Sequence, residues 1–348
     1  MKISMKAWTL CAAAGLAAFG ALAQNAPAGG SPAPVASPTL AAVKARGNLI
    51  CGVIGSSAGF SLPDSQGVMR GIDADSCRAI AAAIFGDANK VKFVSLTAQQ
   101  RLTALQSGEV DVLYANLTWT MSRETRSGVQ FASIHYYDGA GFLVPKQLKI
   151  TSATKLRGAS VCLLSGPAEA VTHEFFAKQK ANYKPVTFTD GEEMRKAFLA
   201  KRCDAYLSDQ SSVAKFRASL GANAENYLLL PEVISKEPLG GAVRKGDDRW
   251  FDIVRYTQYA LVTAEEMGIT AANVASFTSN DPAVRRLLGV EGELGSSMGL
   301  DNRWAVNAIA AVGNYAEVWT RSFANSGLPR GLNRLWSDGG LQYAPPFR

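Results

Sequence analysis

The sequence of 348 residues has few of the features that mark metal-binding or nucleic-acid-binding proteins. It contains only two histidines, His135 and His173, and no Cys-x-x-Cys pair, which argues against a zinc site. The formal charge is +7, but no run of Lys and Arg carries interleaved aromatic residues, so nucleic acid is not an expected partner. Hydrophobic residues make up 47% and charged residues 19%, as in ordinary globular proteins. We expect about two domains and no cofactor or metal.

Long apolar runs are also scarce. The only one, residues 7–22, follows two lysines, is shorter than the ~20 residues that a spanning helix needs, and ends in a small-x-small pattern at Ala21 and Ala23. This pattern predicts a signal peptide at residues 1–23, cleaved near Ala23, and therefore a chain exported to the periplasm. Cys11 follows Trp-Thr-Leu, which is not typical of a lipoprotein anchor.

Export makes the cysteines informative. Outside the predicted signal peptide the chain has four of them, Cys51, Cys77, Cys162 and Cys203. An even number in an oxidising compartment indicates disulfides, with three possible connectivities. Four buried free thiols are the alternative.

The rest of the chain alternates short β-rich runs with amphipathic helices. We expect strands at 48–54, 91–94, 110–113, 160–164, 186–188 and 204–208, and helices at 39–46, 73–85, 97–107, 167–178, 191–201, 210–220, 247–267 and 301–323. Asp73 is the expected cap of the second helix. Two extended stretches, at 136–146 and 234–243, interrupt the alternation. The pattern predicts an α/β fold with mostly parallel sheets, wound by helices on both faces.

One segment, residues 109–126, combines a buried strand with a hydroxyl-rich helix start. Thr118, Thr120 and Ser122 come just before Arg123. Backbone N–H groups at a helix N-terminus favour an anion, and a guanidinium group binds a carboxylate with two hydrogen bonds. The segment therefore predicts a carboxylate site, although a surface arginine on a capped helix has the same local pattern.

Asn116, Thr118 and Arg123 together resemble the carboxylate clamp of periplasmic amino-acid-binding proteins of ABC transporters, and the best match is the general L-amino-acid-binding branch. The similarity runs from about Thr39 to the end of the chain. It includes Gly313-Asn314-Tyr315 and the tail motifs Arg330-Gly-Leu-Asn-Arg-Leu-Trp and Gly-Gly-Leu-Gln-Tyr-Ala-Pro-Pro. The resemblance implies a bilobal, type II periplasmic-binding-protein fold with two parallel-type sheets, two hinge crossovers and a C-terminal helical extension.

The resemblance also divides the chain. We expect a signal peptide at 1–23, a flexible linker at 24–38, the first part of lobe 1 at 39–140, lobe 2 at 141–235, a return to lobe 1 at 236–268 and a C-terminal extension at 269–348. Because hinge motion disfavours covalent links between lobes, we predict the disulfides Cys51–Cys77 and Cys162–Cys203.

Ligand contacts follow from the same resemblance. Arg123 would bind the α-carboxylate with help from Thr118 and Asn116, and Asp209, at the end of a strand, would bind the α-ammonium. Asp209 could instead cap the next helix. Phe60 could stack on the ligand or pack in its loop. The helix start at Gly166 and Ala168 would present N–H groups to an anion. Arg101, Arg126 and Arg244 are expected to be solvated or structural.

Several positions depart from the family pattern. Ala115 stands where the family has Arg, and polar groups are also missing at Leu117, Ala140, Pro167 and Ala168. These changes suggest either a changed ligand, with more tolerance for apolar or modified amino acids, or drift and loss of binding.

The predicted function is capture of an L-amino acid or a close relative between the two lobes, by a monomer that delivers it to the permease of an ABC importer. A dehydratase-like enzyme on the same scaffold is the alternative, with Glu169 as the nearest further carboxylate. Gly55-Ser-Ser57-Ala-Gly59 fits the nucleophile-elbow pattern, but a loop with proline follows it instead of the required helix, so an esterase is disfavoured.

Overall fold

Strands from two separate stretches of the sequence form the first sheet of the computed structural model, which describes residues 36–348. The strand order is β4 (Val91–Ser95), β1 (Leu49–Val53), β5 (Val112–Leu113), β12 (Glu237–Arg244) and β6 (Val129–Asp138). Strand β1 pairs in parallel with β4 and β5, whereas β12 is antiparallel to both β5 and β6. We call this sheet and its helices lobe 1.

The second sheet uses only the chain between residues 140 and 229. Its order is β11 (Tyr227–Leu229), β7 (Ala140–Pro145), β10 (Ala205–Asp209), β8 (Ser160–Leu164) and β9 (Lys184–Phe188). Strand β8 is parallel to β9 and β10, and β7 is antiparallel to β10 and β11. We call this sheet and its helices lobe 2. Both sheets are therefore mixed, because β12 in lobe 1 and β7 in lobe 2 run against the other strands of their sheets. The α/β class is confirmed.

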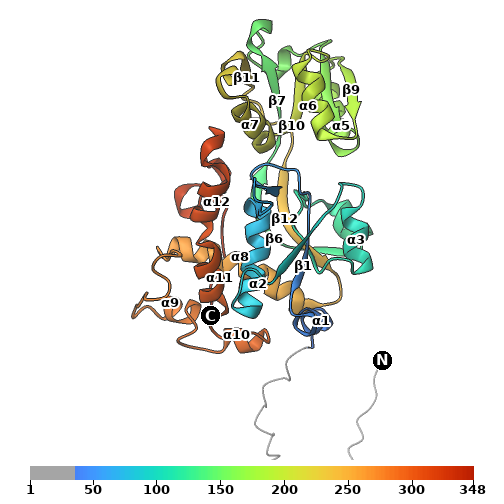
Figure 1. Cartoon of the computed structure of the whole chain (residues 1–348). Helices are drawn as coiled ribbons and strands as arrows, with labels where there is room; N and C mark the ends of the chain where they lie inside the picture. The colour runs from blue at the N-terminus through green and yellow to red at the C-terminus, as the bar shows by residue number, and fades with distance from the viewer. Residues whose placement is uncertain (1–35) are drawn as a thin grey trace, which may run out of the picture. The chain divides into compact units, whose positions relative to one another are not determined.

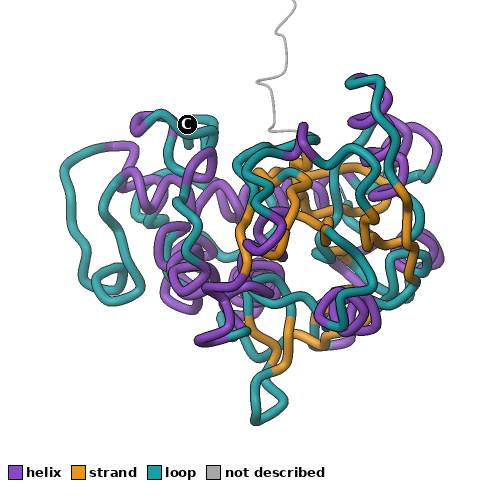
Figure 2. The backbone as a smooth tube through the Cα atoms, turned by 90° about the horizontal axis from the view of Figure 1, so that it is seen from above, coloured by secondary structure: helices purple, strands orange, loops and turns teal. Residues whose placement is uncertain are grey.

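Helices cover both sheets (Figure 1). They are α1 (Pro38–Arg46), α2 (Ile72–Phe85), α3 (Arg101–Ser107), α4 (Met121–Arg126), α5 (Pro167–Lys178), α6 (Gly191–Leu199), α7 (Gln210–Ser219), α8 (Asp248–Glu266), α9 (Pro282–Leu287), α10 (Leu294–Ser297), α11 (Trp304–Val312) and α12 (Tyr315–Phe323). A short hairpin of β2 (Leu62–Pro63) and β3 (Met69–Arg70) precedes α2. Seen from above in Figure 2, the C-terminal helices lie to one side of the strands.

The expected single helix at 301–323 is wrong. Two helices, α11 and α12, replace it because Gly313 has φ 82°, a conformation that few other residues adopt. Asn314 then begins α12 with a capping box, in which its side chain accepts from the Glu317 N–H and the Glu317 side chain accepts from the Asn314 N–H. The Asn-x-x-Glu spacing was visible in the sequence.

The lobes have separate apolar cores. In lobe 2 the strand alternation divides the core, so that Val161 and Leu163 face one cluster while Cys162 faces another. The core of lobe 1 is larger, because α11 and α12 extend it with residues such as Ile309 and Phe323.

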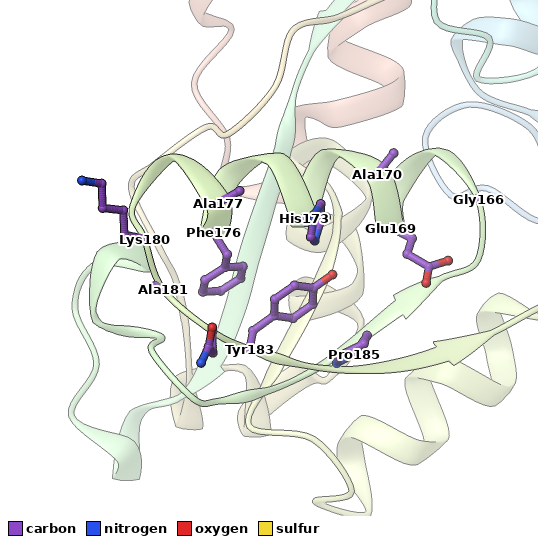
Figure 3. Close-up of a pocket in the computed structure, with 11 residues that line it drawn as sticks. Gly166, Glu169, Ala170, His173, Phe176, Ala177, Lys180, Ala181, Tyr183 and Pro185 are labelled. Atoms are coloured by element: carbon purple, nitrogen blue, oxygen red, sulfur yellow. The ribbon is translucent and has the colours of Figure 1, made fainter.

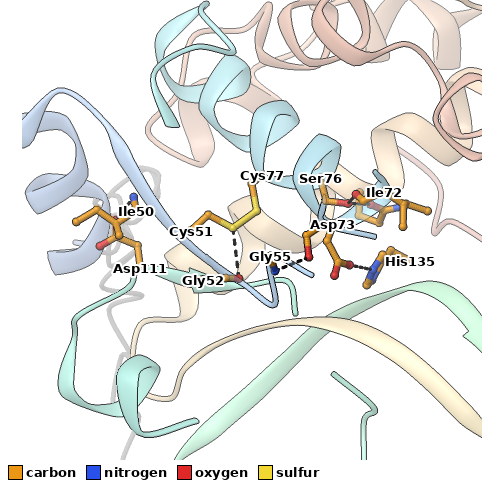
Figure 4. Close-up of a disulfide and its surroundings, with 12 residues drawn as sticks. Ile50, Cys51, Gly52, Gly55, Ile72, Asp73, Ser76, Cys77, Asp111 and His135 are labelled. Carbon is orange, nitrogen blue, oxygen red and sulfur yellow. Dashed lines mark hydrogen bonds and ion pairs between the residues drawn. A yellow bond between two sulfur atoms is a disulfide. The ribbon is translucent and has the colours of Figure 1, made fainter. Parts of the chain in front are cut away.

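Each lobe holds one disulfide. Cys51–Cys77 joins β1 to α2, with the Cα atoms 6.3 Å apart, and Figure 4 shows it. Cys162–Cys203 joins β8 to the turn before β10, with the Cα atoms 5.6 Å apart. These are the predicted pairs.

The predicted signal peptide and most of the predicted linker lie outside the described residues. Among residues 36–348, no helix combines the length and apolarity needed to cross a membrane.

Candidate functional site

The carboxylate clamp predicted from the sequence is centred on the start of α4. Thr120 caps this helix by accepting from the Arg123 N–H at 3.3 Å. The half-buried Arg123 side chain donates from Nη1 to the Thr118 carbonyl at 2.6 Å. The Thr118 hydroxyl in turn donates to Oε2 of Glu237, on the second crossover, at 2.6 Å. Burial lowers the pKa of Arg123, while the charges of Glu237 and Asp209 oppose that shift.

Asn116 connects this clamp to lobe 2. It has φ 48°, a left-handed conformation in which asparagine is better tolerated than most residues. Its N–H donates to Oδ2 of Asp73 at 3.0 Å, and its side-chain Oδ1 is buried without a partner among the described residues. The Asn116 side chain also interacts with the carboxyl of Asp209, at the end of β10. An unsatisfied buried acceptor beside an acidic group is suited to a ligand that carries N–H donors.

Asp209 does not cap the helix that follows it. It occupies the N-cap position of α7, yet its side chain makes no capping hydrogen bond. Asp138, at the end of β6, takes that role by accepting from both the hydroxyl and the N–H of Ser211. The carboxyl of Asp209 is therefore left for another partner.

Three carboxyl groups meet here: Asp138, Asp209 and Glu237. Burial raises the pKa of Asp209 to about 8, and the negative charges of Asp138 and Glu237 act in the same direction. Burial likewise raises the pKa of Asp138 to about 6, with Glu237 adding to the shift. A cation placed among these groups would lower the pKa values again, so the cluster favours an ammonium group.

A second guanidinium group belongs to Arg101, which was expected to be solvated or structural and is in fact buried. Its side chain is buried and its Nη1 donates to the carbonyls of Ala115 at 2.5 Å and Asn116 at 3.1 Å. Its Nε is buried without a partner among the described residues. Burial lowers the pKa of Arg101 to about 10, and the charge of Arg123 acts in the same direction. The available signal was its position at the helix start that follows the carboxyl end of a strand.

Asp73 and His135 support the site from within lobe 1 (Figure 4). Their side chains are fully buried, and Nε2 of His135 lies 2.6 Å from Oδ1 of Asp73. The expectation that Asp73 caps α2 is wrong, because Gly71 is the N-cap. The Asp73 carboxylate instead fixes the Asn116 backbone through its other oxygen.

The remaining predicted residues lie in three different settings. Gly166 is the exposed N-cap of α5, at the end of β8, whose neighbour β10 ends in Asp209. Ala168 packs against the core of lobe 2. Phe60 is fully buried, with ring centroids 5.3 Å from Tyr136 and 5.2 Å from Phe323, as in the packed-loop alternative.

Two of the positions that depart from the family pattern are not on a polar surface. Ala115 and Leu117 are fully buried in an apolar cluster with Leu105 and Phe131. They give no support to the idea that polar groups were lost from the cleft at these positions. Ala140 lies opposite Asp209 in the β7–β10 pairing, and its N–H donates to Ser235.

A groove of about 800 Å³ lies between α5 and β9 of lobe 2 (Figure 3). Phe176 and Tyr183 stack in it at 4.6 Å, and Glu169 lines its end near Gly166. No arginine lines this groove, so it lacks the group that pairs with a carboxylate. Within residues 36–348 no cluster of three or more His, Cys, Asp or Glu side chains is arranged to hold a metal ion.

Comparisons with known proteins identify the family to which the chain belongs. Residues 49–271 match the bacterial extracellular solute-binding proteins, family 3. The glutamate/glutamine/aspartate/asparagine-binding protein BztA of Rhodobacter capsulatus is 50% identical over 337 residues, which covers 95% of this chain and 98% of BztA. The general L-amino acid-binding periplasmic protein AapJ of Rhizobium johnstonii is 48% identical and covers 89% of this chain and 93% of AapJ.

A solved structure is also similar. It is an ABC transporter periplasmic binding protein from Brucella ovis with glutathione bound. Its sequence is 48% identical, its TM-score is 0.86, and the match covers 89% of this chain and 99% of that one.

Proposed function

Because the chain belongs to the bacterial extracellular solute-binding proteins of family 3, we propose that it binds an L-α-amino acid between Arg123 of lobe 1 and Asp209 of lobe 2. The observation that carries the proposal is the meeting of two guanidinium groups and a high-pKa carboxyl group from different lobes. Free amino acids carry the complementary pair of charges.

In this arrangement the α-carboxylate accepts from the Arg123 guanidinium. Thr118, whose hydroxyl donates to Glu237, positions that guanidinium through its carbonyl. The α-ammonium donates to Asp209 and to the buried Oδ1 of Asn116, which otherwise has no partner among the described residues. Gly166 and Ala168 line the lobe 2 side, at the strand edge that Asp209 shares. Phe60 supports the site indirectly, because its ring packs against Tyr136 of β6, the strand that leads to Asp138.

Arg101 indicates the class of side chain. Its buried Nε has no partner among the described residues, and a side-chain carboxylate or amide oxygen would supply one. We therefore propose glutamate, aspartate and their amides in place of the apolar ligands suggested by Ala115. This agrees with what BztA is named for.

A γ-glutamyl peptide is the second candidate ligand, because the Brucella ovis relative contains glutathione. The γ-glutamyl group presents the same α-carboxylate and α-ammonium as free glutamate, so the same clamp would hold it. The two candidates differ only in what lies beyond the side-chain carbonyl.

The chain is a solute-binding protein, as its close relatives are, and not an enzyme. Glu169, the acid that a dehydratase would need, lines the separate groove and lies at the N-terminal end of α5, where the helix dipole favours its charge. We further propose that the chain is exported with cleavage near Ala23, acts as a monomer, and passes its ligand to the permease of an ABC importer.

Titration calorimetry tests the proposal with L-glutamate, L-glutamine, L-aspartate, glutathione, L-leucine and D-glutamate. We expect the L-glutamate group or glutathione to bind about a hundredfold more tightly than L-leucine, because one unmet buried polar group costs on the order of 1–3 kcal/mol. Equal binding of D-glutamate, or tighter binding of L-leucine, would contradict it.

A further inference from the structure

The C-terminal extension holds the strand that leads into the first crossover. Tyr315, at the start of α12, donates its hydroxyl to the His135 carbonyl at 2.9 Å. Asn333 pairs with Tyr137 in both directions: its Oδ1 accepts from the Tyr137 N–H at 2.7 Å, and its Nδ2 donates to the Tyr137 carbonyl at 3.0 Å. The Asn333 amide thus satisfies the backbone at the free edge of β6 as another strand would.

The residue between these two, Tyr136, contacts the same extension through its ring. Its centroid lies 4.7 Å from that of Phe323, the last residue of α12. Phe323 is fully buried, and Lys215 of α7, in lobe 2, lies over the same ring at 5.7 Å. Burial lowers the pKa of Lys215, consistent with its enclosed position. One side chain of the extension therefore contacts both lobes.

These contacts lie directly beside the ligand site and the expected hinge. Asp138, the next residue along β6, is one of the three clustered carboxyl groups and also holds Ser211 at the start of α7. Any rotation of lobe 2 about this crossover must change the backbone at residues 138–139. Residues 135–137 are anchored one after another, so the backbone on the lobe 1 side of the crossover has little freedom to move.

The anchoring groups are buried, so their hydrogen bonds are costly to leave unmade. Tyr315 is 0% and Asn333 4% exposed. Both lie beyond residue 271, where the match to the family ends. These anchoring contacts therefore come from a segment outside the matched family region.

We propose that the C-terminal extension braces the first crossover: Tyr315, Phe323 and Asn333 are positioning residues that fix where β6 delivers Asp138 and that restrict lobe 2 in the ligand-free protein. The purpose of this restriction, capture of a ligand by lobe closure, rests on the proposed function. The restriction itself is a property of the ligand-free protein and is measured without any ligand.

The test is electron–electron distance measurement between spin labels on the two lobes. Lys92→Cys in β4 and Lys178→Cys in α5 provide exposed labelling sites, since the four native cysteines of the described chain form disulfides. Asn333→Ala is compared with Asn273→Ala, a matched control in the same extension. The Asn273 amide also accepts from a backbone N–H, that of Thr270, and donates to a carbonyl, that of Gly268, but it does not contact β6.

We expect Asn333→Ala to broaden the interlobe distance distribution of the ligand-free protein about twofold, because the crossover gains conformations, while Asn273→Ala leaves it as in the unchanged protein. Tyr315→Phe removes only one hydroxyl and should broaden it less. If Asn333→Ala does not fold, the distance distribution of Tyr315→Phe tests the proposal instead.

Distributions that stay unchanged in both Asn333→Ala and Tyr315→Phe would overturn the brace. Equal broadening by Asn273→Ala would overturn it as well, because the effect would then reflect general loosening. Addition of L-glutamate is a separate step. Failure of L-glutamate to narrow the distribution speaks against the proposed ligand and leaves the ligand-free comparison intact.

Discussion

The two lobes contribute to the site in different ways. To the proposed site lobe 1 supplies Arg101, Thr118 and Arg123, whose side chains are already held by protein partners, and Asn116, whose backbone N–H is held by Asp73. Lobe 2 supplies Asp209, whose carboxyl group does not cap its own helix and whose pKa is high. For the proposed ligand, this difference means that lobe 1 offers fixed donors to the carboxylate end, whereas the Asp209 carboxyl of lobe 2 loses its proton only when the ammonium group binds.

The two lobes also differ in the size of their apolar cores. The core of lobe 1 is enlarged by the C-terminal helices, while lobe 2 relies on two small clusters and one disulfide. A lobe with a smaller core depends more on its covalent link.

The largest effect is expected from removing the lobe 2 disulfide. Replacing Cys162 and Cys203 together by Ala opens a loop with a sequence separation of 41 residues, which on the chain-entropy model costs about 4 kcal/mol. Replacing Cys51 and Cys77 opens a loop of 26 at similar cost. Chemical denaturation should show a separate early transition of lobe 2 only in the first variant. A single shared transition in both would contradict the difference between the cores.

Arg123→Ala should weaken L-glutamate binding by about 3 kcal/mol, roughly a hundredfold, because the carboxylate loses its paired cation. Arg123→Lys should recover only part of this, since an ammonium group cannot bind both carboxylate oxygens in the same plane. Calorimetry measures both. Arg126→Ala is the control, an exposed arginine on the same helix, and a loss there as large as at Arg123 would refute the assignment.

The raised pKa of Asp209 should appear in the stability of the ligand-free protein. A carboxyl group whose pKa is raised in the folded state stabilises the fold below its unfolded pKa of 3.8, and that stabilisation is lost as the pH rises through about 8. From pH 5 to pH 9 the free energy of unfolding of the unchanged protein should therefore fall. In Asp209→Asn, whose side chain stays neutral, it should fall by about 1–3 kcal/mol less.

Denaturant titrations at both pH values measure this difference. The exposed Asp301→Asn is the control. Parallel pH profiles for the unchanged protein and Asp209→Asn would show that Asp209 titrates normally.

Local sequence patterns predicted much of this molecule. The strand at 160–164 and the helix at 167–178 have the expected bounds, because Pro167 and the apolar alternation determine them locally. The disulfide pairs followed from the lobe assignment. For the proposed site, Arg123, Thr118, Asn116 and Asp209 were named from the resemblance to the amino-acid-binding family, and their ligand contacts stay predictions.

What could not be predicted depends on contacts between distant segments. Arg101 resembled any surface helix arginine, and only its burial against the chain at 115–116 shows otherwise. The Asp73–His135 pair joins residues 62 positions apart. Phe60 could have stacked on a ligand or packed in its loop, and only its contact with Phe323, from the far end of the chain, favours packing.

If a ligand ammonium group binds the carboxyl group of Asp209, binding must release a proton, and this release can be counted. Because the pKa of Asp209 is about 8, most of this group is protonated at pH 7 and must lose its proton when a cation binds. Calorimetry of L-glutamate binding in two buffers of different ionisation enthalpy gives the number of protons released. We expect release of about one proton at pH 7, falling toward zero above pH 9 and absent in Asp209→Asn. Binding without proton release at pH 7, or equal release in Asp209→Asn, would contradict it.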